Sequence, residues 1–169
     1  MKKIILLILC LFIGLKGVSA EVTSDIAPNS KSAILMDAET GTILFKKNEA
    51  EKLAPASMTK VMSMLLIMEA IDNGSLSLED EVSISENASS MGGSQVYLQT
   101  GEVYQVKELL KGIAVASGND AVVAMAEKIS GTVEEFVARM NERAQELGAV
   151  NTHFVNPHGL DAEDHYTTA

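Results

Sequence analysis

The sequence predicts an α+β domain, in which a cluster of helices accompanies a small antiparallel sheet. Two short runs of β type, 33–36 and 42–46, flank a turn segment that ends in Gly41, which is the pattern of a β-hairpin. From residue 57 onward most of the chain instead shows helical patterning. Because two strands alone do not form a stable sheet layer, either the sheet is completed by residues outside this chain or the fold is mostly helical.

The first twenty residues are predicted to be a secretory signal peptide. A basic start, an apolar run and small residues at the cleavage position follow one another: Lys2-Lys3, 4–15 and Val18-Ser19-Ala20. The alternative is an uncleaved membrane anchor, but the apolar run is short for a bilayer span. We therefore expect an exported protein of the cell envelope, with residues 21–31 as a leader and a domain from residue 32 to 169.

Composition narrows the class of function. The net charge is −10 and no cluster of Lys or Arg is present, so nucleic acid is not an expected partner and electrostatic docking on an anionic membrane is disfavoured. The only cysteine, Cys10, lies in the predicted signal peptide. The mature chain is therefore expected to have neither a disulfide nor thiol chemistry.

The helical elements follow from apolar patterning and from residues that start or stop helices. Residues 57–73 lie between Pro55 and Gly74 and are apolar nearly all round, which predicts a buried central helix. Thr132 with Glu135 matches a capping box. Residues 75–104 are predicted as a mixed region, followed by helices over 106–116 and 120–129. A third helix over 132–147 stops at Gly148, and residues 151–169 form a closing loop.

Ser57 and Lys60 are the first candidate catalytic pair. At a spacing of three, the two side chains share one face at the start of the predicted helix. A helix N-terminus favours the developing negative charge on an attacking Ser oxygen, and the Ser57 N–H is a candidate oxyanion donor. A Lys in apolar surroundings is shifted toward the neutral amine and can act as a general base. A helix-capping Ser followed by an unrelated Lys is the alternative for the motif taken alone.

Ser117 and Asn119 form a second candidate group. They flank Gly118 at a break between two predicted helices, where both side chains can face a cleft. Ser117 could relay a proton between Lys60 and a leaving amine, and Asn119 could orient Lys60 and a substrate amide. A plain interhelical turn is the alternative.

Taken together, these motifs resemble a known family. Ser57-x-x-Lys60 followed by Ser117-Gly118-Asn119 is similar to the first two motifs of the penicillin-recognising serine enzymes. The strings PASMTK, ASGNDA and LGAVNTHFVNPHGLDAEDHYTTA resemble the low-molecular-weight D-alanyl-D-alanine carboxypeptidases, over roughly residues 30–169. The resemblance implies the DD-peptidase and β-lactamase-like transpeptidase fold. It also implies an acyl-enzyme on Ser57, with Lys60 as base, Ser117 as proton relay, Asn119 orienting Lys60 and substrate, and no cofactor.

The chain departs from the family pattern in one respect. The family's third motif, Lys-Thr-Gly, is absent from the sequence, and the only Lys after Asn119 is Lys128. The third motif helps to bind the substrate carboxylate in the family. We therefore expect residues 32–169 to be the N-terminal part of a catalytic domain, with little turnover by itself and with membrane association only through a C-terminal segment not present here.

Several other functions are compatible with the sequence. A class A β-lactamase shares Ser-x-x-Lys but usually has Asp at the position of Gly118 and needs a deacylating Glu in a suitable loop. A wall endopeptidase of the same family cannot be separated from a carboxypeptidase, and a non-catalytic chain that binds β-lactam or peptidoglycan stem peptides is also possible. His153, His158 and His165 lack the spacing of a metal site, so no metal is expected.

Overall fold

The structure is a computed structural model and describes residues 26–169. The predicted signal peptide and the first part of the predicted leader lie outside the described residues. The chain divides into two compact units, the first ending at Lys47 and the second running from Asn48 to Ala169. Each unit is described by itself.

The first unit contains the predicted hairpin. Strands β1 (Ala33–Met36) and β2 (Ile43–Lys47) pair antiparallel, with a bulge next to Met36. The turn is organised by Asp37, whose carboxylate accepts hydrogen bonds from the N–H and the hydroxyl of Thr40 at 2.8 and 2.7 Å. Gly41 supplies the left-handed backbone at φ +70°. The local turn chemistry explains why this element could be predicted.

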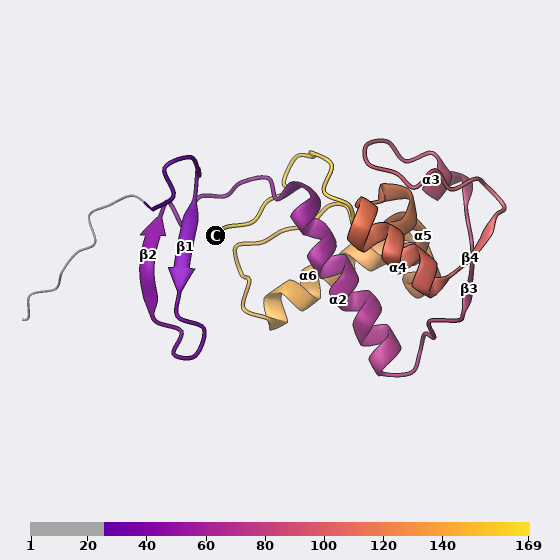
Figure 1. Cartoon of the computed structure of the whole chain (residues 1–169), viewed down its shortest axis with the longest axis horizontal. Coiled ribbons are helices and arrows are strands. Elements are labelled where there is room, and N and C mark those ends of the chain that lie inside the picture. The colour runs from indigo at the N-terminus through magenta and orange to yellow at the C-terminus, as the bar shows by residue number, and fades with distance from the viewer. Residues whose placement is uncertain (1–25) are drawn as a thin grey trace, which may run out of the picture. The chain divides into compact units, whose positions relative to one another are not determined.

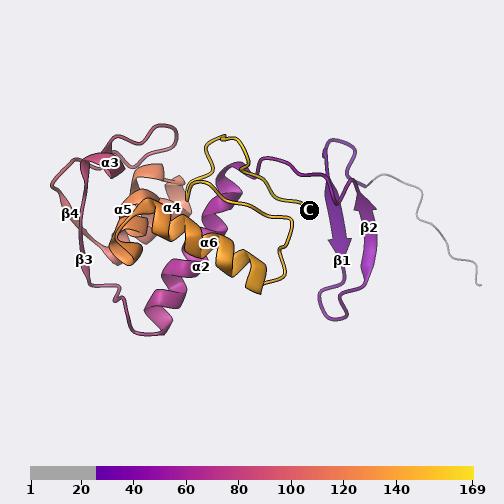
Figure 2. The ribbon, with the colours of Figure 1, turned by 180° about the vertical axis from the view of Figure 1, so that it is seen from behind.

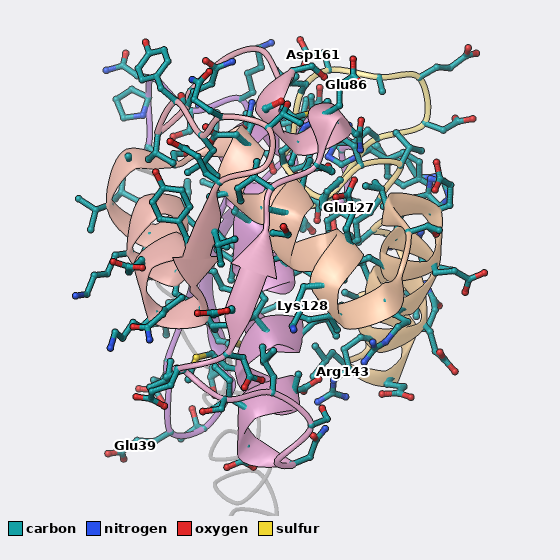
Figure 3. All side chains as sticks on the ribbon, turned by 90° about the vertical axis from the view of Figure 1, so that its right-hand side faces the viewer. Glu39, Glu86, Glu127, Lys128, Arg143 and Asp161 are labelled. Atoms are coloured by element: carbon teal, nitrogen blue, oxygen red, sulfur yellow. The ribbon has the colours of Figure 1, made fainter. Side chains whose placement is uncertain are left out.

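The second unit holds every other element that the structure describes. In chain order these are a 3₁₀ turn, η1, five helices and two short strands: η1 (Ala56–Met58), α2 (Thr59–Asp72), β3 (Glu81–Ser83), α3 (Glu86–Ser89), β4 (Val103–Gln105), α4 (Val106–Ala116), α5 (Asn119–Ser130) and α6 (Val133–Glu146) (Figure 1). Strands β3 and β4 form an antiparallel pair within the region predicted only as mixed. Lys128 of α5 donates from Nζ to the Glu81 carbonyl at 3.1 Å and so connects α5 to β3 (Figure 3).

Helix α5 is the centre of this unit. All eight residues from Asn119 to Ala126 are buried, and the helix packs against α2, α3, α4 and α6 (Figures 1 and 2). Its first turn is therefore fixed on several sides. This matters for function because the second predicted motif lies at that end of α5.

Helix α2 is not buried all round, and the prediction that it would be is wrong. Its residues Leu66, Ile67 and Ala70 are buried in the core. The opposite face carries Val61 and Met68 with 65% and 51% of their surface exposed, because no described element of the second unit covers it. Patterning showed that α2 is apolar, but not which face has a partner.

Local signals set most helix boundaries as expected. Helix α4 occupies the predicted range, and it begins with a reciprocal capping box between Gln105 and Glu108 that the patterning had not indicated. The Thr132 hydroxyl caps α6 by accepting from the Glu135 N–H at 3.1 Å, and Gly148 follows that helix at φ +81°. The turn at Ser117 lies between two of the predicted helices, α4 and α5.

The closing segment, residues 151–169, is an ordered loop that runs beside the start of α2 (Figures 1 and 2). Two isolated antiparallel bridges fix it, one between Leu53 and Thr167 and one between His153 and Tyr166. Among residues 26–169, no helix is long and apolar enough to cross a membrane.

Candidate active site

Ser57 lies on a strained turn at the N-terminal end of α2. It occupies η1 rather than the first turn of an α-helix, so the α-helix begins two residues later than predicted. Ala56, directly before it, has φ +49°, a conformation that residues other than Gly rarely adopt. The Ser57 side chain is exposed. Strain of this kind is often found where a structure must present one side chain, and here it presents a hydroxyl to solvent.

Lys60 is brought next to Ser57, as the spacing of the two residues predicted. Its Nζ lies 3.4 Å from the Ser57 Oγ, while only 3% of the residue is exposed. Nζ also donates to the carbonyl oxygen of His158 at 2.8 Å. Burial lowers the pKa of Lys60 below its usual value. The amine is thus placed within reach of the hydroxyl and shifted toward the form that can accept a proton.

The acceptor on His158 was missed in the sequence analysis, because a backbone carbonyl has no residue type to mark it. The turn around it is built by Asn156, whose Oδ1 accepts from the Gly159 N–H, and by the His158 Nδ1, which accepts from the Leu160 N–H at 3.2 Å. Burial and the nearby Lys60 lower the pKa of His158 to about 4. The ring is therefore neutral at pH 7 and adds no charge beside Lys60.

Further contacts join the closing segment to α2. The Ser63 hydroxyl donates to the Pro157 carbonyl at 2.6 Å, and Thr59 Oγ1 lies 2.8 Å from His165 Nε2. Gly159, at φ +91°, approaches so closely that a Cβ there would meet the carbonyl of Ala56. The N-terminal half of α2 and residues 157–165 therefore pack directly against each other around Lys60.

Ser117 and Asn119 lie on the turn between α4 and α5. Ser117 is the left-handed residue that ends α4, at φ +57°, and is half-buried. Asn119 is buried, with its Nδ2 donating to the Gly92 carbonyl at 2.7 Å and its backbone N–H donating to the Ser94 carbonyl at 2.7 Å. Within residues 26–169, the side chains of Ser117 and Asn119 make no hydrogen bond to Ser57 or Lys60. Their predicted roles remain proposals.

The loop that Asn119 holds lies between the second motif and Leu160 of the closing segment. A Cβ added to Gly93 would lie 2.7 Å from the Asn119 Nδ2 and 3.3 Å from the Leu160 Cδ2. Gly93 is thus in contact with the second motif on one side and with the segment that accepts from Lys60 on the other. The structure places Asn119, the Gly93 loop and residues 158–160 side by side.

Asp120 positions this loop and was not singled out from the sequence. Its carboxylate is buried and accepts hydrogen bonds from the backbone N–H groups of Val96, Leu98 and Ala121 at 2.9 to 3.1 Å. An acidic residue in the first turn of a helix is a recognisable signal, since it complements the helix dipole. Here that signal marked a residue that fixes the loop beside the second motif.

The three histidines do not form a metal site in the part of the chain that the structure describes. His153 Nδ1 lies 2.7 Å from the Asp164 carbonyl, and the His158 and His165 rings are hydrogen-bonded as described above. No group of three or more His, Cys, Asp or Glu among residues 26–169 could hold a metal ion. The chemistry that Ser57 and Lys60 can offer is acyl transfer to a Ser hydroxyl beside a buried amine.

Comparison with known proteins assigns the family. The family model described as D-alanyl-D-alanine carboxypeptidase matches residues 18–169. The chain is 60% identical over 147 residues to the D-alanyl-D-alanine carboxypeptidase DacF of Bacillus subtilis (strain 168), an alignment that covers 87% of this chain and 38% of that protein. The chain therefore spans well under half the length of this relative.

Solved structures agree with that assignment. The D-alanyl-D-alanine carboxypeptidase DacD of Francisella tularensis superposes with a TM-score of 0.82 at 42% identity, covering 86% of this chain and 35% of that one. A penicillin-binding protein of Listeria monocytogenes in its ampicillin-bound form superposes with a TM-score of 0.72 at 26% identity, covering 82% and 56%. The fold is that of the DD-peptidases, and the chain belongs to the D-alanyl-D-alanine carboxypeptidase family of serine peptidases.

Proposed function

We propose that the protein that carries this chain is a serine D-alanyl-D-alanine carboxypeptidase that removes the terminal D-alanine from peptidoglycan stem peptides. The observation that carries the proposal is the pair formed by the exposed Ser57 hydroxyl and the buried Lys60 amine, 3.4 Å apart. A Ser hydroxyl needs a nearby base to act as a nucleophile at neutral pH. Family membership supports the same reaction.

The arrangement suggests how the reaction proceeds. Ser57 Oγ attacks the carbonyl carbon of the penultimate D-alanine, and its proton passes to the neutral Lys60 amine. An N–H of Lys60 remains bonded to the His158 carbonyl, which leaves the nitrogen lone pair free to face Ser57. The peptide C–N bond then breaks as the leaving D-alanine amine takes up a proton. Water finally hydrolyses the Ser57 ester and regenerates the hydroxyl.

Ser117 and Asn119 are proposed to act on the leaving group and the substrate. Ser117 would relay the proton from Lys60 to the leaving amine, and Asn119 would orient Lys60 and the substrate amide. What supports the role of Asn119 is the contact of Gly93 with both Asn119 and Leu160, because residues 158–160 also hold the acceptor of Lys60. The role of Ser117 rests on the resemblance of its motif to that of the family. The Asn119 Nδ2 bond to Gly92 leaves its Oδ1 as the atom able to accept from Lys60.

The partners and location follow from the same proposal. The substrate is a wall peptide, so the enzyme would act outside the cytoplasmic membrane, in agreement with the predicted signal peptide. β-Lactams would acylate Ser57 as substrate mimics, which the ampicillin-bound Listeria relative supports by analogy. We expect neither a nucleic-acid partner nor a cofactor.

The proposal is tested by acylation of Ser57 with a fluorescent penicillin. The purified protein should give a labelled band that Ser57→Ala abolishes, while Ser90→Ala, a change at another exposed serine, leaves it intact. Mass spectrometry should place the label on the peptide that contains Ser57. Labelling that persists in Ser57→Ala would contradict the proposed nucleophile.

Turnover separates the carboxypeptidase from the alternatives. Because Lys-Thr-Gly is absent, D-alanine release should be slow with this chain and rapid with a version that includes downstream sequence. Release from a stem pentapeptide, with little digestion of crosslinked muropeptides, would support a carboxypeptidase. Efficient cleavage of the crosslinks would identify an endopeptidase, and labelling without any turnover in the longer version would indicate a binding protein.

A further inference from the structure

His165 is a buried titratable side chain for which the reaction above has no use. Only 4% of the residue is exposed, and its Nε2 lies 2.8 Å from Oγ1 of Thr59, which is itself buried. The two residues are 106 positions apart in the sequence. A contact of this kind connects the end of the described chain directly to the catalytic turn.

The hydrogen bonds determine the form of the ring. Nδ1 accepts from the Val155 N–H at 3.1 Å, so this nitrogen carries no proton. Nε2 must then carry the proton of the neutral imidazole, and it donates to the Thr59 hydroxyl oxygen. The ring also lies 5.9 Å from that of Phe154, centroid to centroid. With both nitrogens hydrogen-bonded and the Phe154 ring beside it, the ring is held in a single orientation.

Thr59 is well placed to transmit that constraint. It lies between Ser57 and Lys60 in the sequence, and its own N–H is bonded back to the carbonyls of Ala56 and Ser57. Holding the Thr59 side chain therefore fixes the turn that carries the nucleophile. It also holds that turn against the segment whose His158 carbonyl accepts from Lys60.

We propose that His165 is a positioning residue for the acyl transfer: by donating to Thr59 it holds the Ser57 turn and Lys60 in register with the closing segment. The inference rests on the proposed function, because it assigns His165 an effect on the reactivity of Ser57. His165 does not touch the reacting atoms and acts only through Thr59.

Four substitutions separate positioning from simple stabilisation. His165→Phe keeps a ring against Phe154 but removes both polar atoms, and Thr59→Val removes only the hydroxyl. His165→Gln restores a donor near the position of Nε2, whereas His165→Asn restores only an acceptor near the position of Nδ1. Thr132→Ala is the matched control, since it removes the α6 cap and lowers stability at a residue outside both α2 and the closing segment.

The first readout is the rate of Ser57 labelling by fluorescent penicillin per folded molecule. We expect His165→Phe and Thr59→Val each to slow it by about 10- to 100-fold, since displacements near 1 Å have effects of that size. The double variant should be no slower than the slower single variant, because both remove the same contact. His165→Gln should stay within a few-fold of the parent, His165→Asn should be slow, and Thr132→Ala should keep the parent rate despite a lower Tm.

Two results would overturn the inference: an unchanged rate in both His165→Phe and His165→Asn, or a double variant whose slowing is the product of the single effects. If His165→Phe does not fold, the contrast between Gln and Asn decides the question by itself.

A second readout covers the case in which the parent protein is not labelled at all, which would contradict the proposed function instead. The pKa of Lys60 can then be followed through the ¹³Cε shift of labelled lysine. It should rise toward its usual value in Thr59→Val and His165→Asn but not in Thr132→Ala, because a loosened turn admits water to the amine. An unchanged pKa in the first two variants would exclude positioning.

Discussion

Replacing Gly159 by Ala should both lower the stability of the fold and slow the acylation of Ser57. At φ +91° an L side chain is strained, which costs roughly 1–2 kcal/mol. The new Cβ would also meet the Ala56 carbonyl and lie 2.9 Å from the Thr59 Oγ1. Because the nearest atoms belong to the backbone, overpacking adds about 1–3 kcal/mol. The total, roughly 2–5 kcal/mol, is a large share of the ~5–15 kcal/mol by which domains of this kind are stable.

The matched control is Gly148→Ala. Gly148 has φ +81°, but nothing lies within 4 Å of a Cβ built there, so only the conformational cost applies, about 1–2 kcal/mol. Urea unfolding measures the free energy of unfolding of both variants. Penicillin labelling per folded molecule measures the site, and Gly159→Ala should slow it about 100-fold, since Ala56 directly precedes Ser57. Gly148→Ala should label at the parent rate.

Equal losses of stability in the two variants would show that the carbonyl of Ala56 can move aside at little cost. Parent-like labelling in Gly159→Ala would show that the Ser57 turn does not depend on the closing segment. Either result would refute the argument from close packing.

Three further predictions concern charge and protonation. Lys60→Arg should abolish penicillin labelling, by about 10³-fold or more, because a guanidinium stays protonated and cannot act as a base; labelling kinetics would show it. The folded-state pKa of His158, about 4, lies below its unfolded value of 6.5. The free energy of unfolding should therefore fall as pH falls from 6.5 to about 4. Urea titrations at several pH values measure this dependence, and His158→Gln should make it less steep. Asp120→Asn should lower the free energy of unfolding, measured in urea, by about 2–4 kcal/mol. The reason is that one amide oxygen cannot replace both carboxylate oxygens that accept from the N–H groups of Val96 and Leu98. A loss below about 1 kcal/mol would contradict the role of Asp120 in holding the loop.

Elements with strong local signals could be predicted from the sequence. The hairpin follows from its turn, and α4 and α6 follow from apolar periodicity with residues that cap or stop a helix. The short strands β3 and β4 were not predicted, since three residues show too little apolar-polar alternation to be recognised as a strand. The prediction that α2 is buried all round was wrong, because an apolar surface does not reveal which part of it has a partner.

The site was predictable to the same extent. Ser57 and Lys60 are three residues apart, and the 3₁₀ turn that runs into α2 keeps them one turn apart, as the predicted helix would. The groups that complete their surroundings come from distant loops: the His158 carbonyl, the His165 ring and the Asp120 carboxylate. A carbonyl has no residue signature, and the pairing of His165 with Thr59 depends on how the closing segment folds back. Sequence patterns therefore indicated the groups that we propose to react, while tertiary structure supplied what holds them.

The long-range contacts of α2 also bear on the order of folding. Lys60 meets its carbonyl partner 98 positions later, and Thr59 meets His165 106 positions later. Contacts that close such long loops form late and slowly compared with those inside a helix. A chain still emerging from the ribosome or from a translocation channel would have α2 but not its buried lysine. The proposed nucleophile, Ser57, would therefore become reactive only after residue 165 has emerged and docked. Acylation would then begin only when this part of the fold is complete.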